Sequence, residues 1–255
     1  MTHTVAPQVL HSLPLFAGLA EQDRDELVRG GKIRRYESGQ NVFRYGDPIR
    51  SFYVICDGAV QMFRETPNGH EMTTEVLIAG DAIGETEILQ LSPTHQFNAL
   101  AIKDTALIEF PVAWLKDNIR RNGVLALNIL GMLSRRAHIA TVEAEHKATM
   151  TAAQQVSCFL ERLCILHDFD PHGFDLPYSK TLIASRLGME LETFSRTLSK
   201  IRGHGIVIRG NRVSFSDIEE MEAFVCNNCS IVGNCSEHDK LRQLLLKQKP
   251  ARHAT

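Results

Sequence analysis

The pattern of apolar and polar positions changes once along the chain, from a strand period to a helix period. In residues 31–111, short strand-like runs are broken by turn signals such as Asp57-Gly58. Strands at this spacing predict a sandwich or a jelly roll. Before them, residues 21–28 are rich in helix formers and predict a short flanking helix.

After residue 111 the pattern is helical. Apolar and small residues recur at alternating steps of four and three, which is a heptad seam. Small residues at four of these six positions favour close approach of a second helix, so we expect this helix to pair with that of another copy. The seam residues are Ala126, Leu130, Leu133, Ala137, Ala140 and Ala144. A further helix is expected at residues 152–167, with Thr151 as its N-cap.

A helix, a turn and a second helix follow. Ser179-Lys180 opens the first helix, Gly188 lies in the turn, and residues 189–202 form the second helix. This is the helix-turn-helix arrangement, whose second helix enters the major groove of DNA by its N-terminal residues. The apolar core between the two helices is formed by Ile183, Leu187, Phe194, Leu198 and Ile201.

Residues of base-reading types face outward near the start of the second helix. Glu192 can accept a hydrogen bond from cytosine, Arg196 can donate two to guanine, and Ser195 lies beside them. Alone, Glu192 and Arg196 also fit a surface ion pair, but the surrounding helix-turn-helix favours DNA reading. Gly210-Asn211, between two alternating runs, predicts a hairpin wing. The candidate phosphate contacts are Ser179, Lys180, Thr181, Arg209 and Arg212.

These elements predict an α+β chain in four parts. A double-stranded β-helix, or jelly roll, occupies residues 1–122, and a long dimerisation helix occupies residues 123–150. A winged helix-turn-helix occupies residues 151–225, and a cysteine-rich segment follows at residues 226–255.

The composition narrows the function classes. Lys and Arg number 28 against 30 Asp and Glu, a net charge of -2, so any basic surface has to be local. No apolar run reaches the roughly 18 to 20 residues that span a bilayer, and the start, MTHTVAPQ, lacks a signal-peptide pattern. We therefore expect a cytoplasmic protein, without membrane contact, whose six cysteines stay reduced. No nucleophile-base set or phosphate loop is recognisable, so an enzyme is not expected.

Two groups of motifs resemble the CRP/FNR superfamily of transcription regulators. The run Leu191-Glu192-Thr193-Phe194-Ser195-Arg196 resembles the recognition helix of its FNR branch, whereas the cyclic-AMP branch typically has Arg before the Glu and Gly in place of the Ser. The motif Gly39-x-x-Val42-Phe43-x-x-Gly46-Asp47 is similar to the jelly roll of the superfamily. The resemblance covers residues 13–215 and implies a cyclic-nucleotide-binding-like sensor, a homodimer, RNA polymerase as a partner, and an inverted-repeat DNA site with TTGAT/ATCAA half-sites.

In cyclic-nucleotide-binding relatives, a Gly-Glu pair is followed by an arginine and a hydroxyl residue that bind the cyclic phosphate. This chain has Gly84-Glu85 but then Phe97-Asn98-Ala99. Without a cation there, binding of the phosphate would lose several kcal/mol. Cyclic AMP is therefore not expected, and Gly84-Glu85 is interpreted as a relic of the fold or a structural turn.

Three cysteines, Cys226, Cys229 and Cys235, lie within ten residues. Soft thiolates select zinc or an iron-sulfur cluster. The spacing Cys-x2-Cys-x5-Cys is that of cluster-binding cysteines in the FNR branch, although there it precedes the jelly roll. The resemblance therefore implies a [4Fe-4S] cluster whose degradation by oxygen or nitric oxide changes DNA binding.

The fourth ligand is left open, because the position that carries a cysteine in the FNR branch matches Ile108 here. The candidates are Cys164, Cys158, His238, Glu143 and Glu145. A non-cysteine ligand is preferred, since a labile ligand would leave one iron open to an oxidant. Cys56 is interpreted as core. The alternatives are a structural zinc site formed by the three cysteines with His238, or a thiol switch without metal, in a regulator that senses another small molecule.

Overall fold

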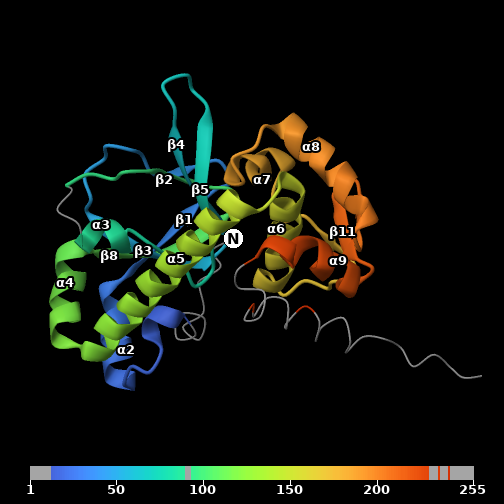
Figure 1. Cartoon of the computed structure of the whole chain (residues 1–255). Helices are drawn as coiled ribbons and strands as arrows, with labels where there is room; N and C mark the ends of the chain where they lie inside the picture. Colours follow the sequence, from blue (N-terminus) through green and yellow to red (C-terminus); the bar gives the residue numbers. More distant parts are fainter. Residues whose placement is uncertain (1–12, 90–92, 230–234, 236–240, 242–255) are drawn as a thin grey trace, which may run out of the picture. The chain divides into compact units, whose positions relative to one another are not determined.

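Antiparallel strands from distant parts of the chain build the first part of the molecule (Figure 1). The computed structural model describes residues 13–89, 93–229, 235 and 241. By its contacts the chain divides into two compact units, Met1–Ala140 and Thr141–Thr255.

The described strands of the first unit form two four-stranded sheets, with strand orders β1-β8-β3-β6 and β2-β7-β4-β5. Neighbours that are far apart in sequence, such as β1 and β8, pair along their whole length. This antiparallel arrangement confirms the predicted jelly roll. The strands are β1 (Lys32–Tyr36), β2 (Asn41–Phe43), β3 (Ser51–Asp57), β4 (Ala59–Glu65), β5 (Glu71–Ile78), β6 (Ala82–Ile83), β7 (Asn98–Ala101) and β8 (Thr105–Pro111).

In the sheet β1-β8-β3-β6, the neighbouring strands β3 and β8 are buried on both faces, whereas β1 is mostly exposed. Successive side chains of a strand point to opposite faces, and in β3 both sets are apolar. Phe52, Val54 and Cys56 pack against the helices, while Tyr53 and Ile55 pack against the second sheet. Cys56 is only 4% exposed and is a core residue, as expected.

Helices cover the outer face of this sheet. Their apolar residues form one core cluster with β3 and β8. The helices are η1 (Pro14–Phe16), α2 (Glu21–Gly30), α3 (Glu85–Leu89), α4 (Val112–Arg121) and α5 (Gly123–Thr149). The observed α5 coincides with the long helix that the heptad pattern predicts. Within the described residues, no helix combines the length and apolar composition that crossing a bilayer requires.

The second unit contains the helix-turn-helix and its wing. Its first helix, α6, begins at a capping box: Thr151 accepts a hydrogen bond from the Gln154 backbone, and the Gln154 side chain accepts one from the Thr151 backbone. This confirms the predicted N-cap. The elements are α6 (Ala152–Leu166), β9 (Phe174–Asp175), α7 (Lys180–Arg186), α8 (Leu191–Lys200), η2 (Ile201–Gly203), β10 (Ile206–Arg209), β11 (Arg212–Phe215), α9 (Ile218–Val225) and η3 (Cys226–Asn228).

Candidate nucleic-acid interface and metal site

The turn between α7 and α8 depends on a glycine. Gly188 has φ +67°, a left-handed conformation that glycine adopts without steric cost. The reversal packs α8 against α7 through the predicted core. Ile183, Phe194, Leu198 and Ile201 are each at most 4% exposed, and Leu187 is partly buried.

The predicted base-reading residues share the exposed face of α8. Ser195 is exposed, and the side chains of Glu192 and Arg196 are 81% and 67% exposed. Arg196 Nη1 lies 3.7 Å from Glu192 Oε1. Exposed pairs of this kind contribute little energy, so both side chains can exchange this contact for a base.

The wing places two arginines at the ends of its hairpin. Arg209 and Arg212 face each other across the Gly210-Asn211 turn, and both are exposed. At the start of α7, Ser179 caps the helix by accepting from the Leu182 backbone. Lys180 Nζ donates to the Gly210 carbonyl at 2.9 Å, which fastens the start of α7 to the wing.

The exposed face of α5 departs from the predicted seam at two of its six positions. Leu130, Ala137, Ala140 and Ala144 are exposed as the seam requires. Leu133, however, is partly buried against the core of the first unit, and Leu127 is 68% exposed. Ala126 is also partly buried. The exposed heptad is therefore Leu127, Leu130, Ser134, Ala137, Thr141 and Ala144.

In the first unit, Glu85 belongs to a charged cluster rather than being a relic of the fold. Its carboxylate is almost fully buried and accepts a hydrogen bond from Arg136 of α5. Arg136 also pairs with Glu75, at 3.2 Å from Nε to Oε1, and donates to the Ala82 carbonyl. A buried carboxylate needs such a cation. The sequence did not reveal this partner because it lies 51 residues away.

Arg136→Met should destabilise the first unit by about 3 to 5 kcal/mol, because the Glu85 carboxylate would remain buried without its cation. Urea unfolding followed by tryptophan fluorescence measures this, since Trp114, the only tryptophan, lies in α4. The matched control is Arg120→Met. Its ion pair with Asp117 is exposed, so its loss should cost at most about 1 kcal/mol. Equal effects of the two variants would mean that Glu85 does not depend on Arg136.

The phosphate-binding arginine of cyclic-nucleotide sensors is replaced by a packed aromatic residue. Phe97 packs against the core between the sheets, and the Arg64 guanidinium lies 4.4 Å from its ring centroid. Asn98 Oδ1 accepts from the Tyr45 backbone. Both positions are thus engaged in packing and backbone bonding.

Two cysteines of the second unit lie beside the end of α5. The His146 ring, in the last turns of that helix, has Cys229 Sγ at 3.6 Å from Nε2 and Cys158 Sγ at 4.0 Å from Nδ1. The pKa of the Cys158 thiol is raised chiefly by burial and then by Glu161, and the charges of Cys235 and Cys226 add to the effect. Cys226 and Cys158 are each 7% exposed. All six cysteines of the chain are thiols rather than disulfides.

Burial raises the pKa of the Cys226 and Cys158 thiols and keeps them protonated. It raises the pKa of Cys226 to about 12, and the charges of Glu161, Cys229 and Cys235 add to the effect. The pKa of Cys158 is raised by burial and then by Glu161. A buried cation is what would make thiolates stable here, since metal ligation requires deprotonated sulfur. The donor set, soft sulfur with one imidazole, suits zinc or iron.

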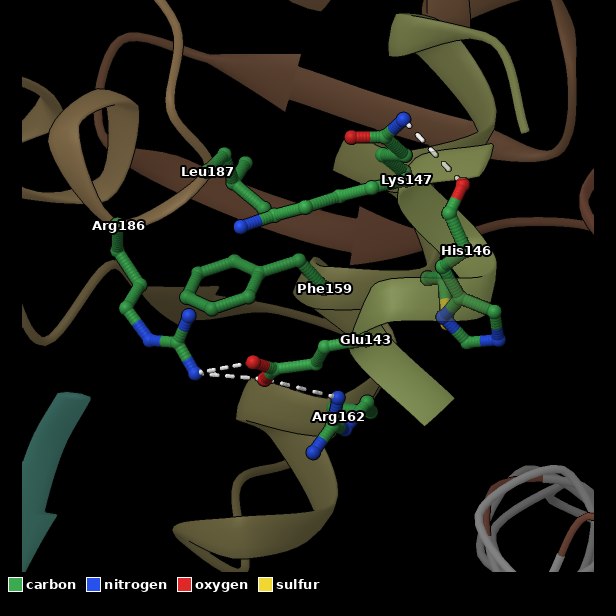
Figure 2. A pocket seen from close by; sticks show the side chains of 9 residues that line it. Glu143, His146, Lys147, Phe159, Arg162, Arg186 and Leu187 are labelled. Atoms are coloured by element: carbon green, nitrogen blue, oxygen red, sulfur yellow. Dashed lines mark hydrogen bonds and ion pairs between the residues drawn. The ribbon is translucent and has the colours of Figure 1, made fainter. Parts of the chain in front are cut away.

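The structure separates the candidates for a fourth ligand. Cys164 Sγ donates to the Phe169 carbonyl at 3.4 Å. The two carboxylate oxygens of Glu143 accept hydrogen bonds from Arg186 Nη2 at 2.6 and 2.7 Å (Figure 2). Arg162 Nη1 lies 3.5 Å from Glu143 Oε1. Glu145 projects about 200° away from Glu143 around the helix axis. His238 lies outside the described residues.

His146 is the residue of this site that the sequence analysis missed. Local sequence spacing did not reveal it, because its contacts Cys158 and Cys229 lie 12 and 83 residues away. Figure 2 shows Glu143 and His146 on α5 beside the pocket that Phe159, Arg162 and Arg186 line. Within the described part of the chain, no three His, Cys, Asp or Glu side chains are already arranged to hold a metal ion.

The jelly roll and the winged helix-turn-helix with an exposed reading face define a DNA-binding regulator with an N-terminal sensor domain. Residues 33–122 match the cyclic nucleotide-binding domain family, and residues 154–224 match the Crp-like helix-turn-helix domain family. The chain belongs to the CRP/FNR family of transcription regulators.

Two curated relatives illustrate the range of this similarity. The cyclic AMP receptor protein of Thermus thermophilus is 29% identical over 77% of this chain and 89% of its own length. The transcriptional activator protein anr of Pseudomonas aeruginosa is 26% identical over 82% of this chain and 86% of its own length. Such relatives are regulators, which confirms the expectation that the chain is not an enzyme.

A solved structure shows the shared fold. The structure of FixK2 from Bradyrhizobium japonicum matches with a TM-score of 0.66 at 21% identity, covering 76% of this chain and 96% of that chain. Members of the family bind DNA as dimers.

Proposed function

We propose that this chain is a homodimeric, redox-responsive regulator that binds an inverted-repeat DNA site and holds a [4Fe-4S] cluster through Cys226, Cys229 and Cys235. The observation that supports the proposal is the position of Cys229 and Cys158 beside the two ring nitrogens of His146, in the same unit as the helix-turn-helix. Such a regulator acts in the cytoplasm, on DNA and with RNA polymerase.

DNA reading is assigned to three residues of α8. Glu192, Ser195 and Arg196 lie on its exposed face, and their chemistry fits cytosine and guanine edges. Half-sites of the TTGAT/ATCAA type follow from the resemblance of this helix to the FNR branch. Because two copies of α8 read two half-sites, the half-sites would lie about 34 Å apart, one turn of DNA.

Phosphate contacts are assigned to the ends of the same motif. Exposed cations and hydroxyl groups at the start of a helix or on a wing bind phosphate without reading sequence. The residues proposed for this role are Ser179, Lys180, Thr181, Arg209 and Arg212.

The exposed heptad of α5 supports the homodimer. Leu127 and Leu130 are 68% and 57% exposed, which is unusual for leucines on a helix of a folded domain. The same stripe on a second chain would cover them.

The raised pKa values of the buried Cys158 and Cys226 thiols favour a metal site over a thiol switch. A redox-sensitive thiol reacts as an accessible thiolate with a lowered pKa, whereas Cys158 and Cys226 are buried and their pKa values are raised. Binding of a metal overcomes the raised thiol pKa, because the metal stabilises the thiolate. An iron-sulfur cluster also supplies a centre that oxygen or nitric oxide can attack. Cyclic AMP is not proposed as the effector, because Phe97 stands where its relatives carry the phosphate-binding arginine.

Protein isolated without oxygen should be brown and contain about four iron and four sulfide per chain, the composition of a [4Fe-4S] cluster. Exposure to air should bleach the absorption and change the affinity for an inverted-repeat duplex. Iron, sulfide and zinc analysis together with a DNA titration provides the test. A colourless protein with one zinc per chain would replace the cluster by a structural zinc site, and a protein with neither metal would contradict both assignments.

A further inference from the structure

The wing is the hairpin of β10 and β11, and its turn is tied to the segment that leads into α7. The Gly210 carbonyl accepts a hydrogen bond from Lys180 Nζ at 2.9 Å. The next carbonyl, that of Asn211, accepts one from the Leu176 backbone at 3.0 Å. The turn of the wing is therefore fixed relative to the first helix of the reading motif.

Arg212, the first residue of β11, supplies a further contact between the wing and this segment. Its Nη2 donates to the Gly173 carbonyl at 2.9 Å, and its Nη1 lies 3.8 Å from Asp175 Oδ2 of β9. Gly173 leaves room for the guanidinium, because a Cβ built there would lie 2.6 Å from Arg212 Nη2 and 2.9 Å from its Nε. The contact therefore depends on the absence of a side chain at residue 173.

Arg209, on the opposite strand of the hairpin, has different surroundings. Arg209 and Arg212 are cross-strand partners, and like charges in such a position repel each other. Asp175 lies beside Arg212, whereas within the described part of the chain the exposed Arg209 side chain makes no hydrogen bond or ion pair. Arg209 therefore keeps its donors for a phosphate, while Arg212 uses its own within the protein.

We infer that Arg212 and Lys180 are positioning residues, which hold the wing against the helix-turn-helix so that Arg209 meets the DNA backbone. The inference rests on the proposed function, because it concerns how the same motif binds DNA. It narrows the phosphate assignment, in which Ser179, Thr181 and Arg209 remain.

The two roles differ in how they combine with Arg209. Side chains that bind separate phosphates act independently, so their losses multiply, and each loss lowers the slope of log affinity against log salt concentration by about 0.9. A side chain that acts by placing Arg209 contributes nothing further once Arg209 is removed. A double-mutant cycle therefore separates a second phosphate contact from a positioning residue.

For this cycle, the full-length wild type, Arg209→Ala, Arg212→Ala and the double variant are titrated with a TTGAT/ATCAA duplex at several salt concentrations. Arg212→Ala alone should bind about 3- to 10-fold more weakly, which is the scale of one hydrogen bond. The double variant should bind as Arg209→Ala does, with a salt slope lowered by about 0.9 rather than about 1.8. Thermal unfolding of Arg212→Ala should be nearly unchanged, because its side chain is 60% exposed.

Gly173→Ala disturbs the same contact without removing a charge. Its methyl group would occupy the place of the Arg212 guanidinium. This variant should weaken DNA binding as Arg212→Ala does, and it should have no effect in the Arg209→Ala background. Gly203→Ala is the matched control, because a Cβ there meets open space, and it should bind like the wild type.

The outcomes separate this inference from the proposed function. If the losses of Arg209→Ala and Arg212→Ala multiply, or if Gly173→Ala binds like the wild type, Arg212 is not a positioning residue, while DNA binding stands. The same cycle with Lys180→Ala decides the other contact, and multiplied losses would overturn the inference for Lys180.

A random duplex completes the test. If the wild type binds the TTGAT/ATCAA duplex no better than the random one, the proposed sequence reading is wrong. The cycle measured on the random duplex still decides the role of Arg212, because phosphate contacts carry no sequence information.

Discussion

Arg196→Ala should bind the cognate duplex about 1 to 3 kcal/mol more weakly, roughly 5- to 150-fold, and should lose discrimination at one base pair. The Arg196 side chain is exposed and its Nη1 lies 3.7 Å from Glu192 Oε1, so the free protein loses little stability when Arg196 is replaced. Titration of a matched TTGAT/ATCAA duplex and of single-mismatch duplexes measures both effects.

Arg209→Ala is the comparator for this variant. Its side chain lies on the wing, so its loss should weaken binding to all DNA sequences alike. It should also reduce the salt dependence of binding by about one counterion. Lys180 is less suitable as a comparator, because its Nζ also donates a hydrogen bond to the Gly210 carbonyl. If Arg196→Ala lost equal affinity on matched and mismatched duplexes, Arg196 would belong with the phosphate contacts.

Leu130→Glu should convert the dimer into folded monomers. Leu130 is 57% exposed in one chain, so glutamate is tolerated there, but in the dimer two carboxylates would be buried at the seam. Burying these two carboxylates costs about 3 kcal/mol or more, and this cost raises the dissociation constant of the dimer by more than about 100-fold. Sedimentation measures the change, and binding to a palindromic duplex should weaken with it.

Leu166→Glu is the control, because Leu166 is also 57% exposed but lies at the end of α6. It should remain dimeric. Dimers of Leu130→Glu at the wild-type affinity would remove this face of α5 from the interface.

The local features of the fold could be predicted because they depend on neighbouring residues. The helical period and the cap at Thr151 fixed α5 and α6, and Gly188 and Gly210 marked turns that require left-handed backbone. The exposed face of α8 followed as well, since the apolar residues of an amphipathic helix determine which side remains exposed.

Features that depend on distant contacts could not be predicted. Leu133 fits the heptad as well as its neighbours do, and only the core of the first unit decides that it points inward. Glu85 gave no sign of Arg136, and Cys158 resembled a plain core residue next to Phe159. His146 was missed because its partners, Cys158 and Cys229, lie 12 and 83 residues away.

The carboxylate of Glu143 joins three helices, because it belongs to α5 and receives Arg162 from α6 and Arg186 from α7, the first helix of the reading motif. It stands one helical turn before His146. Coupling between two binding sites is reciprocal. If metal at His146 and the cysteines changes the affinity for DNA by some factor, then DNA changes the affinity for the metal by the same factor. Under the proposed function, a regulator bound to its operator would then release its cofactor from a different equilibrium than one free in solution, and the two arginines on Glu143 would link the end of α5 to the helix-turn-helix.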